Sequence, residues 1–236
     1  SAASDVYKRQ QHENDREATA ADLKWLADPA EEPEPFGDAG TKMAWNTFNV
    51  VSIYPNGNPV MSDVNQRWVG DCCACAVIAS MAYLYPRFVK HIIKDNMDKT
   101  YTVTMYDPTG KQISVGVGGD YFIGNSGDLG ALGGRNKEVT WATILEKAMI
   151  KWNQIYQGSS NVGGIGTEYV SAIFTGDGES VGFGANALIA EDLQRAVEVS
   201  LKQGRLVIGG FTRSGEQVDQ NWQTTSGHAF TFILPD

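Results

Sequence analysis

The chain has 236 residues, a formal net charge of −9 and 42% hydrophobic residues, a length that suits one large domain or two small ones. Aromatic residues make up 10% and the glycines follow no period, which excludes collagen-like, coiled-coil and wholly disordered chains. The excess of acidic residues argues against a nucleic-acid binder, and no stretch approaches the roughly 18 apolar residues of a membrane span.

The negative charge is concentrated at the start of the chain. Residues 1–40 hold ten acidic and four basic residues, so they carry −6 of the total of −9. The acidic, proline-rich run at 31–35 predicts a solvated leader or linker over residues 1–44, followed by one globular domain over 45–236. Residues 1–10 resemble translated sequencing adapter, so we expect them to be an artefact.

The first predicted elements lie between residues 48 and 117. A strand is expected at 48–54, followed by a dense turn signal. A helix is expected over 71–85 with Pro86 as its stop, and because it is apolar on nearly every face it should be buried. Residues 101–106 and 112–117 alternate around a turn, which predicts a β-hairpin.

Helices and strands also alternate irregularly in the second half of the chain. Apolar spacing predicts a helix over 141–156 with Thr140 as its N-cap, and a third helix over 192–203. Two strands are expected at 206–211 and 228–234. Because no regular βαβ alternation is present, the pattern favours an α+β fold.

All three cysteines, Cys72, Cys73 and Cys75, lie in the first turn of the predicted helix 71–85. An odd count without a distant partner cannot build a disulfide framework. A thiol at a helix N-terminus feels the positive end of the helix dipole, which favours the nucleophilic thiolate, so Cys72 is the predicted nucleophile. Cys73 and Cys75 are expected to fill the core. Thiolates so close on one helix cannot all face one ion, so we expect no metal and no cofactor.

The loop before this helix carries residues that suit a thiol nucleophile. Gly70 would permit close approach just before the helix, and Asp71 could cap it. Gln66 carries a side-chain amide that could stabilise an oxyanion near Cys72.

A thiolate that attacks a carbonyl carbon needs a base, normally histidine. His12 lies in the leader, and His91 is expected to be a solvated surface residue beside Lys90. His228 begins an apolar strand, where a rigid element would hold the ring, so it is the predicted partner of Cys72.

The spacing of these residues resembles the calpain-type cysteine peptidases, in which a glutamine stands six residues before the catalytic cysteine, as Gln66 precedes Cys72. Three further stretches resemble that family in the same order: 138–151, with its tryptophan and Leu-Glu-Lys-Ala core; 163–164 with 174–176; and 227–230, which reads Gly-His-Ala-Phe. The resemblance spans about residues 60 to 236.

The resemblance implies a papain-like fold, with a helical lobe that carries Cys72 and a β-rich lobe that carries His228. It implies a bacterial-type, calpain-like cysteine endopeptidase that hydrolyses peptide bonds of a protein or peptide substrate through a thioester. Cys72 would be the nucleophile, His228 the base and later the acid, and Gln66 an oxyanion donor together with the Cys72 backbone N–H. Three glycines would bind the substrate: Gly70, Gly164 and Gly227.

The sequence departs from the family in two places. Cys73 stands where the family usually has tryptophan, and the third catalytic residue, an asparagine followed by Pro and Trp, is expected beyond Asp236. We therefore expect the C-terminal end of the catalytic domain to be missing, and we infer no calcium dependence. Two alternatives stay open: a catalytically incomplete domain that binds peptides or regulates, and transfer of the acyl group to an amine instead of water.

Overall fold

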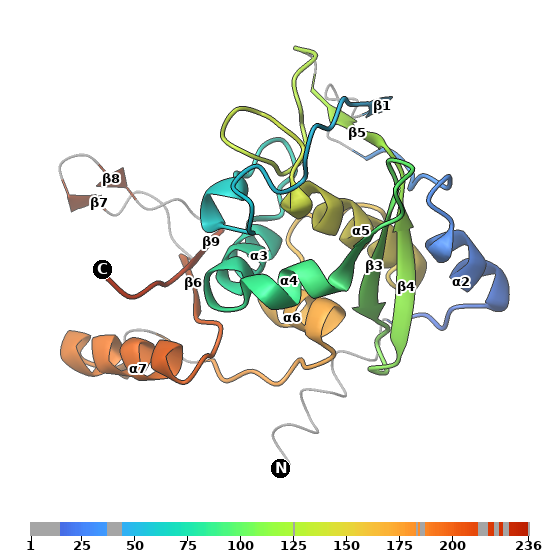
Figure 1. The fold of residues 1–236 in the computed structure, drawn as a ribbon. Helices are drawn as coiled ribbons and strands as arrows, with labels where there is room; N and C mark the ends of the chain where they lie inside the picture. Colours follow the sequence, from blue (N-terminus) through green and yellow to red (C-terminus); the bar gives the residue numbers. More distant parts are fainter. Residues whose placement is uncertain are drawn as a thin grey trace.

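Helices and antiparallel strands make up the computed structural model, which describes residues 15–36, 44–124, 126–182, 184, 187–211, 217–219, 222–223 and 227–235 (Figure 1). The helices are α2 (Ala20–Ala27), α3 (Cys72–Leu84), α4 (Pro86–Ile92), α5 (Trp141–Tyr156), α6 (Thr167–Thr175), α7 (Ala190–Lys202) and the 3-10 helix η1 (Met61–Asp63). The strands are β1 (Ala44–Thr47), β2 (Ile93–Asp95), β3 (Tyr101–Tyr106), β4 (Gln112–Val117), β5 (Asp120–Ile123), β6 (Ile208–Phe211), β7 (Gln217–Asp219), β8 (Trp222–Gln223) and β9 (His228–Thr231). The predicted α+β fold is confirmed.

The antiparallel sheet β2-β3-β4 contains the predicted hairpin with the predicted bounds. Its register pairs Tyr101 with Val117 and Tyr106 with Gln112. The Asp107 carboxylate closes the turn by accepting hydrogen bonds from backbone N–H groups that follow it, an Asx turn of the kind that aspartate favours. Helices α5 and α6 pack against this sheet, and α2 lies beside β4 (Figure 1).

Helices α3 and α5 supply much of the core. Helix α3 begins at Cys72 and ends before Pro86, close to the prediction, and most of its residues after the first turn are buried. Pro86 does stop α3, but it also begins α4, because proline is tolerated in the first helical turn. Helix α5 matches the predicted 141–156, and the Thr140 hydroxyl caps it by accepting a hydrogen bond from the Ala142 N–H.

Within the described ranges, no single helix has both the length and the apolarity of a membrane span. The pair α3 and α4, bent by 113° at their junction, meets those criteria only when the two helices are counted together.

The predicted strand at 48–54 is wrong. The strand lies earlier, at β1, and pairs with β5. After Thr47 the chain is held by single backbone bonds, from Phe48 N–H to Gly119 O and from the N–H of Trp141 to Ile53 O. Most of the apolar side chains at 48–54 pack on the core, but Val51 is 95% exposed and the segment has no continuous neighbouring strand.

Two further segments near the predicted site differ from the prediction. Residues 167–175, where the sequence predicted no element, form α6, which ends at Gly176 with a left-handed φ of 76°. Helix α7 lies within two residues of its predicted bounds, whereas β6 and β9 are shorter than predicted. Strands β6 and β9 pair antiparallel, and β9 packs beside α3 (Figure 1).

Residues 15–36, which we call the N-terminal strap, are docked on the domain. Helix α2 is capped at Thr19, and its Leu26 is 0% exposed. The interpretation of the whole leader as solvated linker is therefore wrong for this segment. The predicted artefact at 1–10 and His12 lie outside the described residues.

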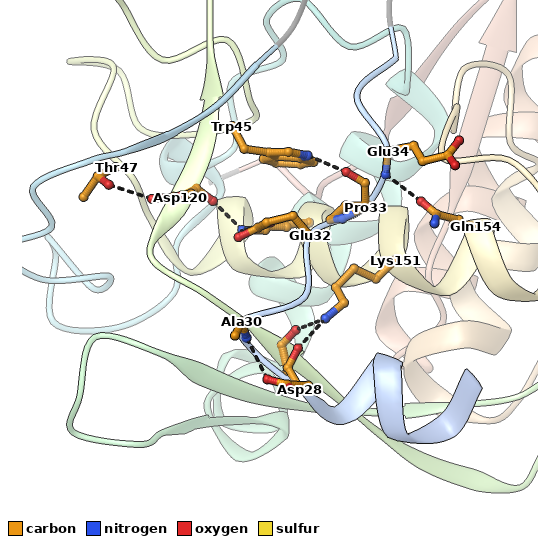
Figure 2. Close-up of polar contacts among 12 residues, drawn as sticks. Asp28, Ala30, Glu32, Pro33, Glu34, Trp45, Thr47, Asp120, Lys151 and Gln154 are labelled. Carbon is orange, nitrogen blue, oxygen red and sulfur yellow. Dashed lines mark hydrogen bonds and ion pairs between the residues drawn. The ribbon is translucent and has the colours of Figure 1, made fainter. Parts of the chain in front are cut away.

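Two buried lysines of α5 hold the strap, and Figure 2 shows one of them, Lys151, reaching Asp28. Lys147 Nζ lies 2.6 Å from a carboxylate oxygen of Glu32. Lys151, which is 0% exposed, donates hydrogen bonds of 2.8 Å to the backbone oxygens of Asp28 and Gly116. A buried ammonium group needs such partners, because desolvation without them is strongly unfavourable. The acidic strap supplies them, which is why it is not solvated.

Candidate active site

Cys72 begins α3, and its sulphur faces the start of β9. Cys72 Sγ lies 3.5 Å from Gly227 O and 3.4 Å from Ala229 N, the backbone atoms on either side of His228. The structure thus brings together the helix start and the strand that carry the predicted nucleophile and base. These segments are 155 residues apart in the sequence.

His228 is held in β9 by its backbone, which pairs with Phe211 of β6. The residue is exposed, and the contacts to Cys72 Sγ come from its chain neighbours. Gly227 has a φ of 65°, in the left-handed region that favours glycine, and it turns the chain into β9.

Gln66, Gly70 and Gly164 lie around the entry to α3. Gln66 Nε2 donates a hydrogen bond of 2.9 Å to Val69 O, which closes the loop before the helix. The Gly164 N–H donates to Gly70 O at 3.3 Å, so the glycine loop and the helix entry are joined. A Cβ atom added at Gly70 or Gly164 would meet nothing within 4 Å, which shows open space beside both backbones.

Two cavities border these predicted site residues. One, of about 410 Å³, is lined by residues that include Gln66, Trp68 and Lys137. The other, of about 320 Å³, is lined by residues that include Gly164 and Tyr169. Neither lining includes Cys72 or His228, so the cavities border the loop of Gln66 and the loop of Gly164 and do not enclose the sulphur.

The other two thiols differ from Cys72. Burial, followed by the neighbouring Cys72, raises the pKa of Cys73 to about 11. Burial also raises the pKa of Cys75, whose sulphur donates a 3.5 Å hydrogen bond to Asp71 Oδ1 and packs against the core. Both thiols are therefore protonated at neutral pH. Among the described residues, no group of three or more His, Cys, Asp or Glu side chains is placed to hold a metal ion.

Asp71 occupies the N-cap position of α3, but its side chain makes no capping hydrogen bond, so the predicted cap is wrong. Its carboxyl group points instead to Glu146 of α5, and each residue is only 1% exposed. Burial raises the pKa of Asp71 to about 6 and raises that of Glu146 well above its ordinary value. The sequence analysis did not single out Glu146. The signal that could have found it is an acidic residue between Leu145 and Ala148 on an apolar helix.

Comparison with protein families gives a match over most of the chain. The model of the calpain family cysteine protease matches residues 43–234 of the chain, which is well over half of it. The chain belongs to the calpain family of cysteine proteases. The matched span of this calpain-family domain contains all six predicted site residues, and the resemblance inferred from the four motifs is confirmed. Comparison with curated proteins gives no significant match.

Proposed function

We propose that this calpain-family domain is an endopeptidase that hydrolyses internal peptide bonds of protein substrates, with Cys72 as the nucleophile. One observation carries the proposal: Cys72 Sγ at the start of α3 contacts the backbone on both sides of His228, at 3.5 Å and 3.4 Å. The backbone of the strand that carries His228 thus already lies beside the sulphur. Membership of a cysteine protease family supports the same chemistry.

The proposed reaction passes through a covalent thioester. The Cys72 thiolate attacks the carbonyl carbon, and the bond to the leaving nitrogen breaks as His228 donates a proton to that nitrogen. His228 then removes a proton from water, whose oxygen attacks the thioester carbon, and the bond to sulphur breaks to release the acid product and restore the Cys72 thiolate. The imidazole gives up one proton in the first step and regains one in the second, so the cycle needs no other proton carrier.

Two donors are proposed for the oxyanion that forms during each attack. The Cys72 backbone N–H lies in the first turn of α3, where N–H groups lack intrahelical partners. Gln66 Nε2 carries two hydrogens, so donation to Val69 O leaves the second for a substrate oxygen. The open backbones of Gly70 and Gly164 would bind the substrate main chain, and Gly227 would do so on the other side of the sulphur.

The test compares Cys72→Ser with Cys73→Ser, its neighbour on the same helical turn. We expect Cys72→Ser to abolish cleavage of a labelled unfolded protein and to abolish labelling by the epoxide E-64, because a serine hydroxyl is not ionised here. Cys73→Ser should keep both, since the Cys73 thiol is protonated at neutral pH. Labelling that persists in a folded Cys72→Ser protein would show that the wrong thiol was chosen.

A catalytically incomplete domain that binds peptides is the second candidate. It is favoured by the present hydrogen bonds, since Cys72 Sγ contacts backbone atoms and the Gln66 amide is bonded to Val69 O. Such a domain would bind an unfolded protein without cleaving it, and Cys72 would be alkylated with a midpoint near pH 8.5, the value of a free thiol. Cleavage together with a midpoint well below that pH would exclude it.

A further inference from the structure

Two buried carboxyl groups meet directly behind the predicted nucleophile. Asp71 is the residue before Cys72, and Glu146 lies in the second turn of α5. The two carboxyl groups lie close enough to each other to interact directly. Asp71 Oδ1 also accepts a hydrogen bond from Cys75 Sγ at 3.5 Å, and Glu146 Oε2 accepts one from the Leu132 N–H at 3.0 Å.

The remaining carboxyl oxygens have no other described partner. Asp71 Oδ2 and Glu146 Oε1 are both buried, and among the described residues no donor reaches either of them. The titratable groups that face the pair are the thiols of α3, and no described lysine or arginine contributes to it. Two ionised carboxylates in this place would repel each other without a compensating cation. A hydrogen bond between two carboxyl groups also requires that one of them carries a proton.

We propose that Asp71 and Glu146 share a single proton, and that this hydrogen bond is the positioning device that holds Cys72 against β9. It ties the start of α3 to α5, and through Glu146 Oε2 to the backbone at Leu132. Neither carboxyl group touches a substrate, so both act through Cys72. The inference rests on the proposed function only in taking Cys72 as the reacting thiol.

The shared proton sets an upper limit to the pH at which Cys72 stays reactive. While the proton is held, the pair carries one negative charge and the helix start stays docked. When it leaves, two like charges stand in the core next to Cys72, which pushes α3 away from α5 and disfavours a thiolate. Burial raises the pKa of both carboxyl groups, and repulsion between two adjacent carboxylates further opposes loss of the shared proton. The alkylation rate of Cys72 should then fall at high pH, where the rate of an ordinary thiol only rises to a plateau.

The experiment measures the rate of Cys72 alkylation by iodoacetamide, with the modified residue identified by mass spectrometry, from about pH 6 to about pH 10. Four proteins are compared: wild type, Glu146→Gln, Asp71→Asn and Glu32→Gln. Either amide at the pair can donate the same hydrogen bond without a proton that can leave. Glu32→Gln is the matched control, because it removes a half-buried carboxylate that binds Lys147 of the same helix.

As the pH increases, we expect the alkylation rate of Cys72 in the wild type and in Glu32→Gln first to rise and then to fall severalfold. Glu146→Gln and Asp71→Asn should have the wild-type alkylation rate near neutral pH, and their rate should not fall at high pH. A Glu146→Leu protein, which cannot form the hydrogen bond, should lose reactivity severalfold even at neutral pH. The proposal is overturned by a wild-type profile that never falls, or by a fall that stays at the same pH in Glu146→Gln.

The outcome does not depend on peptidase activity. Alkylation needs no substrate turnover, so a protein that cleaves nothing can still show the predicted profiles, and the endopeptidase proposal alone would then fail. Conversely, a protein that cleaves with Cys72 but gives identical profiles for the wild type and Glu146→Gln would leave the endopeptidase proposal standing and overturn this one.

Discussion

At the scale of single residues, Gly227 controls how the chain enters β9 beside Cys72. Its φ is 65°, and a Cβ atom built there would meet nothing within 4 Å. An alanine would therefore act through the backbone alone. We expect Gly227→Ala to destabilise the fold by about 1 kcal/mol, the usual cost of a left-handed non-glycine residue, and to lower Cys72 alkylation severalfold as Gly227 O moves. Thermal unfolding and alkylation rates measure the two effects.

Gly57 provides the control for this substitution. It has a φ of 78°, and it too has nothing within 4 Å of an added Cβ. Gly57→Ala should lose similar stability and keep the wild-type alkylation rate. Equal losses of reactivity in both variants would contradict a local role for Gly227.

Individual site residues could be predicted from the sequence where one local signal marked them. Cys72 was found from its place at a helix start, and the structure puts it there. Asp71 was predicted to be a cap, because aspartate before a helix is usually one. Its carboxyl group instead meets Glu146, a contact across the core that spacing along the chain does not reveal.

At the scale of elements, α5 joins the strap to the core through charged side chains. Lys151 is fully buried and donates to two backbone oxygens, Asp28 O and Gly116 O. We expect Lys151→Met, which keeps the approximate size, to destabilise the protein by about 2 kcal/mol because both carbonyls lose a donor. Lys202→Met, at an exposed lysine of α7, should change stability by less than about 0.5 kcal/mol. Denaturant unfolding compares them.

The effect of Lys151 also depends on pH. Burial lowers the pKa of Lys151 to about 8, so between that value and the unfolded value the unfolded chain binds more protons. The wild type should therefore gain stability relative to Lys151→Met as the pH rises above about 8. A stability difference that is constant over that range would contradict a buried ammonium group.

The carboxyl pair between α3 and α5 makes the stability of the fold change with pH in the opposite direction, so that stability falls as the pH rises. Both pKa values are raised, so the folded protein holds a proton that the unfolded chain has lost above about pH 4. The stabilisation is complete below that pH and is lost as the pH rises through the folded pKa values, by up to about 1.4 kcal/mol per pH unit and proton. We expect thermal unfolding of Glu146→Gln to depend less on pH between about 5 and 7 than that of the wild type. Glu31→Gln, at an exposed site, should keep the wild-type slope.

Elements with strong local patterns were predictable, and elements that depend on partners were not. The hairpin β3-β4 and helix α5 have the predicted bounds, since alternation, turn residues and caps lie within each segment. The strand predicted at 48–54 failed because a strand needs a neighbour, and the short β5 pairs with 44–47 instead. Helix α6 was missed because glycines precede it closely and its apolar face is only nine residues long.

At the scale of the whole molecule, the N-terminal strap is part of the domain. It covers Lys147 and Lys151 and buries Leu26 against the core. We expect deletion of residues 1–36 to lower the unfolding temperature by more than about 10 °C. The deletion removes several kcal/mol of contacts, and each kcal/mol lowers the unfolding temperature by about 2–4 °C. Calorimetry measures the change. A synthetic peptide of residues 15–36, added in trans, should restore part of the loss, and a peptide with Leu26 replaced by Asp should not.

The composition of the strap could not reveal its docking. An acidic, proline-rich segment is typical of a solvated linker, and only the buried cations of α5, more than a hundred residues later, give its charges a binding site. The overall class was predictable, because the mixture of helices and strands and the ordered motifs both pointed to it.

The 155-residue separation between Cys72 and Gly227 also affects how the protein is made. Chains emerge from the ribosome with the N-terminal part first, and early segments begin to fold before later ones exist. Helix α3 and its thiol are therefore synthesised well before the strand that faces the sulphur. During that interval the nascent chain carries the Cys72 thiol without the strand that bears its proposed partner, so a peptidase of the proposed kind would be inactive on the ribosome.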